Sequence, residues 1–208
     1  MAAYSDYYKL VKTFLPGVPE PTIDYALNRA ARHFCSLSWF SRRSITIALV
    51  ADQISYTLAP ADSTNEEIIG VHAVEYDDKP LDPTKPELVE TESGTPKQWY
   101  TEQYTALVLN PYPDAGVDGE SVNVRIAIQP TLAATTLPND LTREHMQTLA
   151  DGAIAWLQQM PKQPWTDLNQ SMRLERAFLA KAMRAKETAM RGAMPWGLGV
   201  RRPVFAVR

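Results

Sequence analysis

The chain has 208 residues, of which 45% are apolar and 22% charged, and its net charge of −3 is ordinary for a folded soluble protein. Its length allows one domain or a helical body with a smaller inserted domain. The single cysteine, Cys35, excludes an intrachain disulfide and any CxxC metal motif. We find neither a signal-peptide pattern nor the run of roughly eighteen apolar residues that a membrane helix requires.

Two helices are predicted before residue 40. The first covers residues 6–14, with Ser5 as its N-cap, and ends at Pro16 and Gly17. The second follows Pro21, with Thr22 as a candidate cap. Its core-facing residues recur at steps of three and four: Ile23, Leu27, Ala30, Phe34 and Leu37. On the opposite face we expect three polar residues: Asp24, Asn28 and Arg32.

From residue 41 the apolar period changes from that of a helix to the period of two that is typical of strands. The pattern predicts short strands at 44–49, 54–58, 67–76, 98–100, 106–109 and 122–128. Turns are expected near Ala51-Asp52 and at Asp77-Asp78, and the proline-rich stretch 79–94 is expected to form a loop. These strands predict a small antiparallel sheet or sandwich between residues 42 and 130.

Helical periodicity returns after residue 138, where Asn139 or Asp140 is the candidate N-cap. The broad apolar face of this helix comprises Met146, Leu149, Ala150, Ala153, Trp156, Leu157 and Met160. Pro161 and Pro164 end the helix.

A second long helix is predicted over residues 167–190, with one apolar side formed by Leu168, Met172, Leu179, Met183 and Met190. A second band, about 80° wide by the helical period, comprises Arg173, Arg176, Arg184 and Arg191. Arginine favours bidentate contacts with carboxylates or phosphates. We therefore weigh three roles for the band: a solvated helix face, contacts with a neighbouring copy, or contacts with DNA in a channel.

The C-terminal end of the chain is basic and unusually rich in apolar residues for a tail. From residue 162 onward there are ten basic and three acidic residues, a net charge of +7, which leaves −10 for the rest. Residues 193–208 contain two prolines and two glycines within an apolar and basic segment, which predicts an extended tail. Such a segment requires a groove or a sheet edge on another chain, so we expect it to dock on a partner.

The sequence contains no recognisable catalytic or metal-binding motif. The three histidines, His33, His72 and His145, lack partners at metal-ligand spacing, and we expect structural roles for them. Phosphate-binding glycine loops, a nucleophile elbow and an HExxH motif are absent from the sequence. The acid pairs Glu66-Glu67 and Asp77-Asp78 fall at a strand start and a turn, where solvated carboxylates are common. We therefore predict a protein that is not an enzyme and that needs no metal or cofactor.

The order of several segments resembles the head-to-tail adaptor (connector, or tail tubular A-like) proteins of tailed bacteriophages. The segments are the helix from Pro21 to Phe34-Cys35, a hairpin in ITIALVADQISYTLAP (45–60), VHAVEYDDKPL (71–81), GTPKQWYTEQYTALVLNPYPD (94–114) and ADGAIAWLQQMPKQPW (150–165). The third and fourth are similar to the family's strand–turn–"x-P-L" run and to its "G-x-P-x-x-(W/Y)Y … L-x-L-x-P-x-P" element. The resemblance spans about residues 16–192.

This resemblance implies an α+β fold, in which a helical bundle from residues 1–41 and 131–192 carries an inserted antiparallel β domain at 42–130 and a docking tail at 193–208. It implies a homo-oligomeric ring, usually of twelve copies, that joins the portal protein to a tail nozzle or tube protein. Genomic DNA would pass through the ring without sequence specificity. The protein would be made in the host cytoplasm and reside at the head-to-tail junction of the virion, with no membrane contact.

Two sets of residues are the candidate sites. The expected portal-docking residues are Trp196, Leu198, Val200, Arg201, Arg202, Val204 and Phe205. The expected inter-subunit or channel-facing residues are Arg173, Arg176, Arg184 and Arg191. The alternative function is a DNA-binding protein that uses the arginine-rich helix, and an enzyme with a site in the β domain is a third hypothesis.

Overall fold

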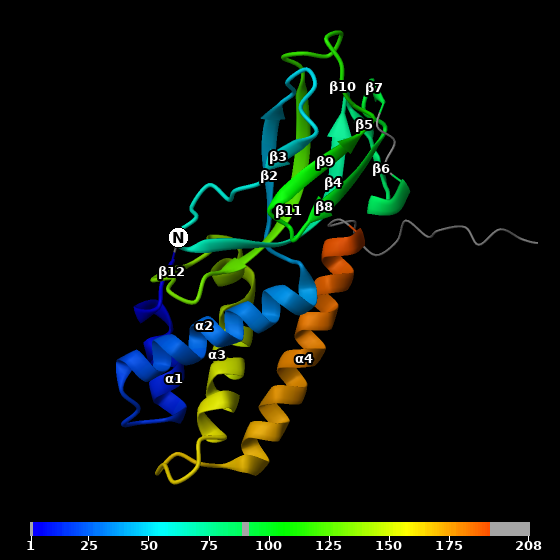
Figure 1. Cartoon of the computed structure of the whole chain (residues 1–208). Helices are drawn as coiled ribbons and strands as arrows, with labels where there is room; N and C mark the ends of the chain where they lie inside the picture. Colours follow the sequence, from blue (N-terminus) through cyan, green and yellow to red (C-terminus); the bar gives the residue numbers. More distant parts are fainter. Residues whose placement is uncertain (1, 89–91, 192–208) are drawn as a thin grey trace, which may run out of the picture.

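The computed structural model describes residues 2–88 and 92–191 and shows the predicted α+β fold, with one apolar core among the helices and a second core between β-sheets (Figure 1). The helices within the described residues are α1 (Ser5–Phe14), α2 (Glu20–Ser38), α3 (Asn139–Gln158) and α4 (Leu168–Arg191). The division of the chain at residues 41, 130 and 192 stays a prediction, as does the arrangement of the helices as a bundle, and the tail at 193–208 lies outside the described residues.

The predicted side-chain caps of the helices are wrong. Ser5, Thr22, Asn139 and Asp140 are not caps, because α1, α2 and α3 begin after Tyr4, Pro19 and Pro138 without any side-chain cap hydrogen bond. Both prolines have extended ψ angles, and their carbonyl groups accept the first helical amides, such as Thr22 N at 3.0 Å and Thr142 N at 3.3 Å. The fixed φ of proline therefore sets where α2 and α3 start.

The helical core is built as the apolar periods predict, with one exception on α2. Ile23, Leu27 and Phe34 are fully buried against α3. Asn28, expected on the solvent face, is only 6% exposed, because its amide donates to the Tyr4 hydroxyl and to the Thr131 carbonyl, both at 2.9 Å. Tyr4 and Thr131, both distant in sequence, contact this part of α2, so the periodicity of α2 alone does not predict that Asn28 is buried.

Helix α3 is kinked at His145, whose φ of −127° departs from helical geometry. The imidazole ring lies 4.7 Å from the Phe34 ring and 4.5 Å from the Phe40 ring, centroid to centroid. Burial lowers the pKa of His145, an effect that exceeds the opposing influence of the nearby carboxylates of Glu144 and Asp140. The residue is thus a neutral packing group, in the structural role expected for it.

Two four-stranded sheets form the rest of the fold. Their strands are β2 (Arg42–Ala48), β3 (Ser55–Thr57), β4 (Glu66–Tyr76), β5 (Lys79–Pro80), β6 (Asp82–Pro83), β8 (Gln98–Glu102), β9 (Ala106–Asn110) and β11 (Ser121–Pro130). Strand order is β2-β11-β4-β5 in one sheet and β3-β9-β8-β6 in the other. Two short pairs complete the described set: β1 (Ala2–Ala3) with β12 (Thr136–Leu137), and β7 (Ser93–Gly94) with β10 (Tyr112–Pro113). A 3-10 turn, η1 (Pro86–Leu88), follows β6.

The core between the sheets follows from the period of two along β11. Val122, Val124, Ile126 and Ile128 are all fully buried and belong to the same apolar cluster as Leu107 of β9. Alternation of buried and exposed residues is what a sheet with one covered face requires. The sandwich is not purely antiparallel, however, because β6 pairs with β8, and β7 with β10, in parallel.

The predicted hairpin at 45–60 is wrong. Strand β2 pairs with β11 of one sheet, whereas β3 pairs with β9 of the other. Between them the chain crosses the edge of the sandwich, and its backbone bonds to distant loops: Leu49 N donates to Glu120 O at 2.7 Å and Asp52 N to Pro113 O at 2.9 Å. Two alternating segments joined by a turn have the same local pattern whether they pair or separate, so sequence periodicity cannot distinguish the two cases.

Close contact between α3 and α4 depends on Gly152. A Cβ at this position would lie 2.7 Å from the Phe178 ring and 3.3 Å from the Ala30 Cβ. Phe178 is 3% exposed, so its ring has little room to move. Ser171 strengthens the same contact by donating its hydroxyl to the Ala155 carbonyl at 2.8 Å.

We expect Gly152→Ala to lower the free energy of unfolding by about 1–2 kcal/mol, because overpacking against Phe178 outweighs the higher helix propensity of alanine. Urea denaturation followed by circular dichroism measures the change. Adding Phe178→Leu should cost less in the Gly152→Ala background than in the native chain, because the smaller side chain relieves the clash. Additive effects of the two substitutions would contradict a clash at this position.

Candidate functional site

The arginine band lies on the solvent side of α4. Arg173, Arg176 and Arg184 are exposed, and none of them forms an ion pair with another described residue. Lys181, on the inner side of the same helix, pairs with Asp151 of α3 at 2.9 Å. The side chain of Arg191 lies outside the described residues. Three uncompensated guanidinium groups therefore remain available for carboxylates or phosphates of a partner.

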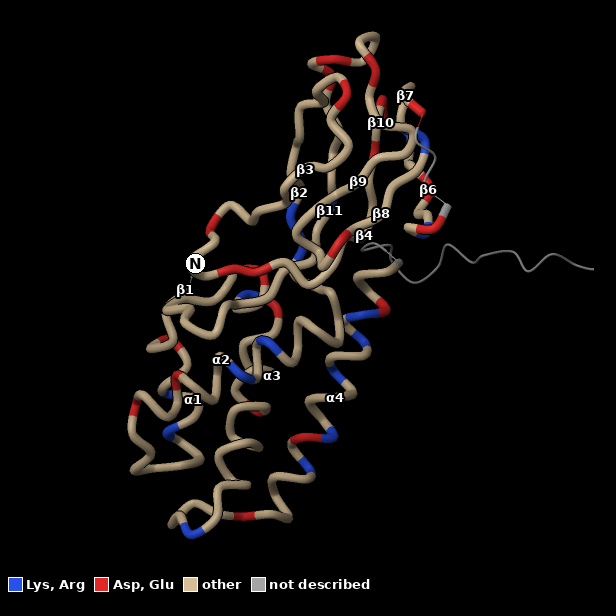
Figure 2. The backbone as a smooth tube through the Cα atoms, in the orientation of Figure 1, with Lys and Arg blue, Asp and Glu red and all other residues tan. Residues whose placement is uncertain are grey.

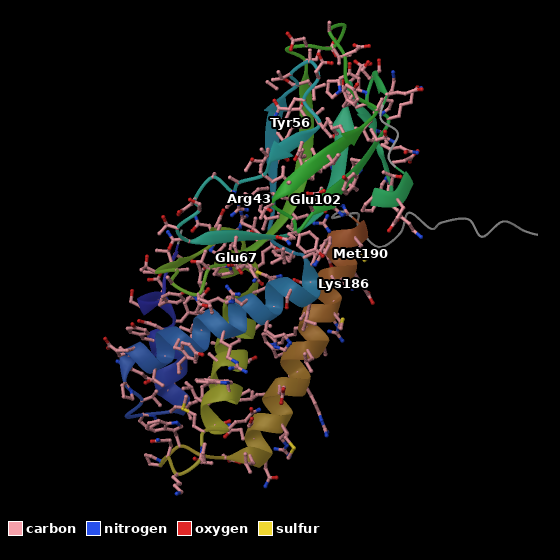
Figure 3. The ribbon with its side chains drawn as sticks, in the orientation of Figure 1. Arg43, Tyr56, Glu67, Glu102, Lys186 and Met190 are labelled. Carbon is pink, nitrogen blue, oxygen red and sulfur yellow. The ribbon has the colours of Figure 1, made fainter. Side chains whose placement is uncertain are left out.

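The apolar side predicted for α4 faces solvent along most of its length. Leu168, Met172, Met183 and Met190 are 59%, 50%, 48% and 68% exposed, whereas Leu179 is partly buried. The buried side consists instead of Ser171, Phe178, Ala182 and Ala185. Small residues allow α4 to approach α3 and α2 closely, which leaves the larger apolar side chains outside. Figure 3 shows Met190 and Lys186 at the C-terminal end of α4.

The negative charge of the chain is concentrated in the β part. Residues 42–130 contain fifteen acidic and six basic residues, a net charge of −9, whereas 2–41 contain three acidic and four basic residues. Helix α4 has six basic and two acidic residues, a net charge of +4. Figure 2 shows these charges as red segments over the sheets and blue segments along α4. The acidic body expected from the sequence is thus the β part, and α4 is its basic counterpart.

Where the helices meet the sheets, Arg43 of β2 links the two parts of the fold (Figure 3). Its guanidinium lies 3.1 Å from the Glu66 carboxylate of β4 and 3.4 Å from the Asp140 carboxylate of α3. The Ser41 hydroxyl also donates to Asp140, at 2.7 Å. Glu66, expected to be a solvated carboxylate, has a side chain that is only 4% exposed, so that expectation is wrong.

A second ion pair supports the same junction. Arg32 of α2 donates to the Pro130 carbonyl at 2.7 Å and pairs with Glu67 at 2.9 Å. Gln129 donates to the same Glu67 oxygen. The sequence did not predict that Arg43, Glu66 and Asp140 lie together. Up to 97 residues separate them, and their spacing follows no recognisable motif.

Within the described residues, His33 and His72 are exposed, whereas His145 is partly buried. The His33 ring is tilted against the Phe178 ring, with centroids 5.6 Å apart. Partial desolvation lowers the pKa of His72, and the positive charges of Arg42 and Arg125 lower it further. Cys35 is fully buried, and burial raises the pKa of its thiol. No group of three or more potential metal ligands occurs within residues 2–88 and 92–191.

Two shallow hollows are found beside α4. One, of about 140 Å³, lies between α2, α3 and α4 and contains Arg29 over the Trp156 ring at 5.3 Å and Glu175 bonded to Gln159 at 3.2 Å. The other, of about 240 Å³, is bounded by Phe40, His145 and Arg184. In neither hollow does a described hydroxyl group hydrogen-bond to a histidine or a carboxylate, and the Thr188 hydroxyl donates instead to the Arg184 carbonyl. The dimensions of both hollows suit a partner's side chain better than a substrate.

The expected portal-docking residues, Trp196, Leu198, Val200, Arg201, Arg202, Val204 and Phe205, all lie outside the described residues. Among the described helices none is long and apolar enough to cross a membrane.

Comparison with known proteins gives one family match. A family model described as "SU10 adaptor protein" matches residues 2–202, which is nearly the whole chain. None of the curated proteins matches it.

The ion pairs of Arg43, where the helices meet the sheets, lead to a prediction about the free energy of unfolding. Arg43→Ala should lower the free energy of unfolding by about 2–3 kcal/mol, because it leaves the buried Glu66 carboxylate without its cation. The matched control is Lys79→Ala, whose pair with Asp77 is exposed on both sides and should contribute less than about 0.5 kcal/mol. Both values can be read from urea denaturation at one pH, and equal losses in the two variants would argue against a structural role for Arg43.

Proposed function

This chain belongs to the family of SU10 adaptor proteins, the head-to-tail adaptors of tailed bacteriophages, and we propose that it forms a ring of twelve copies between the portal protein and the tail. Membership gives it a structural role in the neck of the virion. The family match over residues 2–202 is the observation that carries the proposal. The separation of charge between the β part and α4 supports it, since copies in a ring meet through two different surfaces.

The ring has two axial partners in this proposal. Residues 193–208 dock on the portal protein through the apolar side chains of Trp196, Leu198, Val200, Val204 and Phe205, with Arg201 and Arg202 facing portal carboxylates. The opposite end of the ring receives a tail nozzle or tube protein. Genomic DNA passes through the central channel, where contacts would involve the phosphate backbone and carry no sequence preference.

Deletion of residues 196–208 tests the docking role of the tail. We expect filled heads without tails in electron micrographs of lysates complemented with the deletion, while circular dichroism of the purified chain stays unchanged. Two milder variants separate the forces. Trp196→Ala with Phe205→Ala should reduce joining more strongly than Arg201→Gln with Arg202→Gln, because burial of aromatic groups dominates interface energies. Infectious particles at the native yield from the deletion would overturn this role.

The alternative function, DNA binding through α4, is favoured by one observation, the three unpaired arginines. It requires an affinity for free duplex DNA that falls steeply with salt, because each phosphate contact releases counterions. The adaptor proposal expects no stable complex at about 150 mM salt. A gel-shift titration decides between them, with Arg173→Gln/Arg176→Gln/Arg184→Gln as the variant. A complex that this triple variant abolishes would favour the DNA-binding protein.

A further inference from the structure

The large apolar residues on the outer side of α4 lie along one side of the helix, which they share with Lys186. Leu168, Met172, Leu179, Met183 and Met190 fall within about 60° of one another around the helix by the 3.6-residue period. Four of the five are about half exposed or more. The row runs from the first turn of the helix to its last, a length of about 33 Å at 1.5 Å per residue. Single exposed apolar residues are common, but several large ones along one side of a helix mark an interaction surface.

The position of the row limits what can cover it. Helix α4 lies along one long edge of the helical part, and α1 lies along the other, with α2 and α3 between them (Figure 1). A partner stacked above or below the helical part would reach only one end of the row. A partner that covers all of it must lie alongside, which is the position of the neighbouring copy in a ring.

The distribution of charge also indicates that a second copy of this chain covers the apolar row. Arg173, Arg176 and Arg184 flank the apolar row and have no ion-pair partner among the described residues of their own chain. A second copy provides carboxylates for these guanidinium groups, because its residues 42–130 have a net charge of −9. Methionines at three of the five positions suit such a contact, because their flexible side chains adapt to an irregular surface.

We propose that the Leu168–Met172–Leu179–Met183–Met190 row is the lateral contact through which α4 packs against a second copy of this chain. The surface of that copy that meets the row differs from α4, because α4 is itself basic and its arginines need carboxylates. The contact is therefore heterologous, and heterologous contacts close into rings when the rotation between copies closes. This inference rests on the proposed function and deepens it, because it names a surface that joins the subunits.

Site-specific photocrosslinking in assembled phage particles tests the contact. Because Cys35 is fully buried, a photoreactive maleimide on full-length Met172→Cys labels that position alone. The matched control is Thr188→Cys, which is exposed on the face of α4 about 160° from Met172. The labelled chains complement a phage that lacks its own copy, and illuminated particles are analysed by electrophoresis and mass spectrometry.

We expect Met172→Cys to give a covalent dimer of this chain joined to a peptide outside residues 168–191, at a yield at least several-fold above that of Thr188→Cys. A crosslink to the portal or a tail protein, to α4 of the second copy, or to nothing would overturn the contact. Particles that contain the chain but no such dimer refute this inference alone, whereas particles that join heads to tails without the chain refute the proposed function.

A second variant tests the same contact without a crosslinking probe. Met172→Lys with Met183→Lys should leave the far-ultraviolet circular dichroism and the denaturation midpoint unchanged, because both side chains are exposed. The number of adaptor copies in particles should fall at least several-fold, because charged groups cannot be buried unpaired in the contact. Leu132→Lys, at a residue 76% exposed and away from α4, should keep the native copy number. A native copy number in the double variant would contradict the contact.

Discussion

The guanidinium group of Arg43 links the sheet part of the molecule to its helical part, because it contacts the carboxylates of Glu66 on β4 and of Asp140 on α3. The Glu66 side chain is 4% exposed and would be strongly destabilised without its cation, so it fixes the position of the guanidinium within the sheet. The same group, together with the Ser41 hydroxyl, then holds Asp140 and the start of α3 against the sheet. For a subunit that connects a head to a tail, a fixed angle between its two parts keeps the surfaces at its two ends in register.

Much of this architecture follows from periodicity alone. The four long helices and the strands of β2, β4, β9 and β11 occur within a few residues of the predicted segments, because long periodic patterns reflect which face is buried. The ion pairs of Arg43 could not be predicted from the sequence, because its partners lie in distant segments. The residues around a charged side chain in a strand do not indicate whether that side chain is buried. The pairing of β2 and β3 with different sheets could not be predicted either, because a hairpin and two separated strands have the same local pattern of apolar residues.

Helix α4 shows where amphipathic analysis reaches its limit. The helix has two apolar stripes, one of small residues with Phe178 and one of leucines and methionines, and periodicity does not indicate which stripe meets the chain's own core. The sequence favours the stripe with the larger residues, whereas the packing selects the smaller one, because Gly152 allows a close approach only there. An apolar stripe left outside a monomer has the same sequence signature as a core, since a subunit contact is built from the same residue types.

The two charge centres favour the proposed assembly of this chain with copies of itself. A uniform distribution of −3 would give weak repulsion at every orientation, whereas −9 in the β part and +4 on α4 make attraction depend on orientation. Arginine flanks select the orientation, and the apolar row supplies the buried area that holds it. The same separation opposes contacts between two β parts or between two α4 helices, and so favours the head-to-tail order that the proposed ring requires.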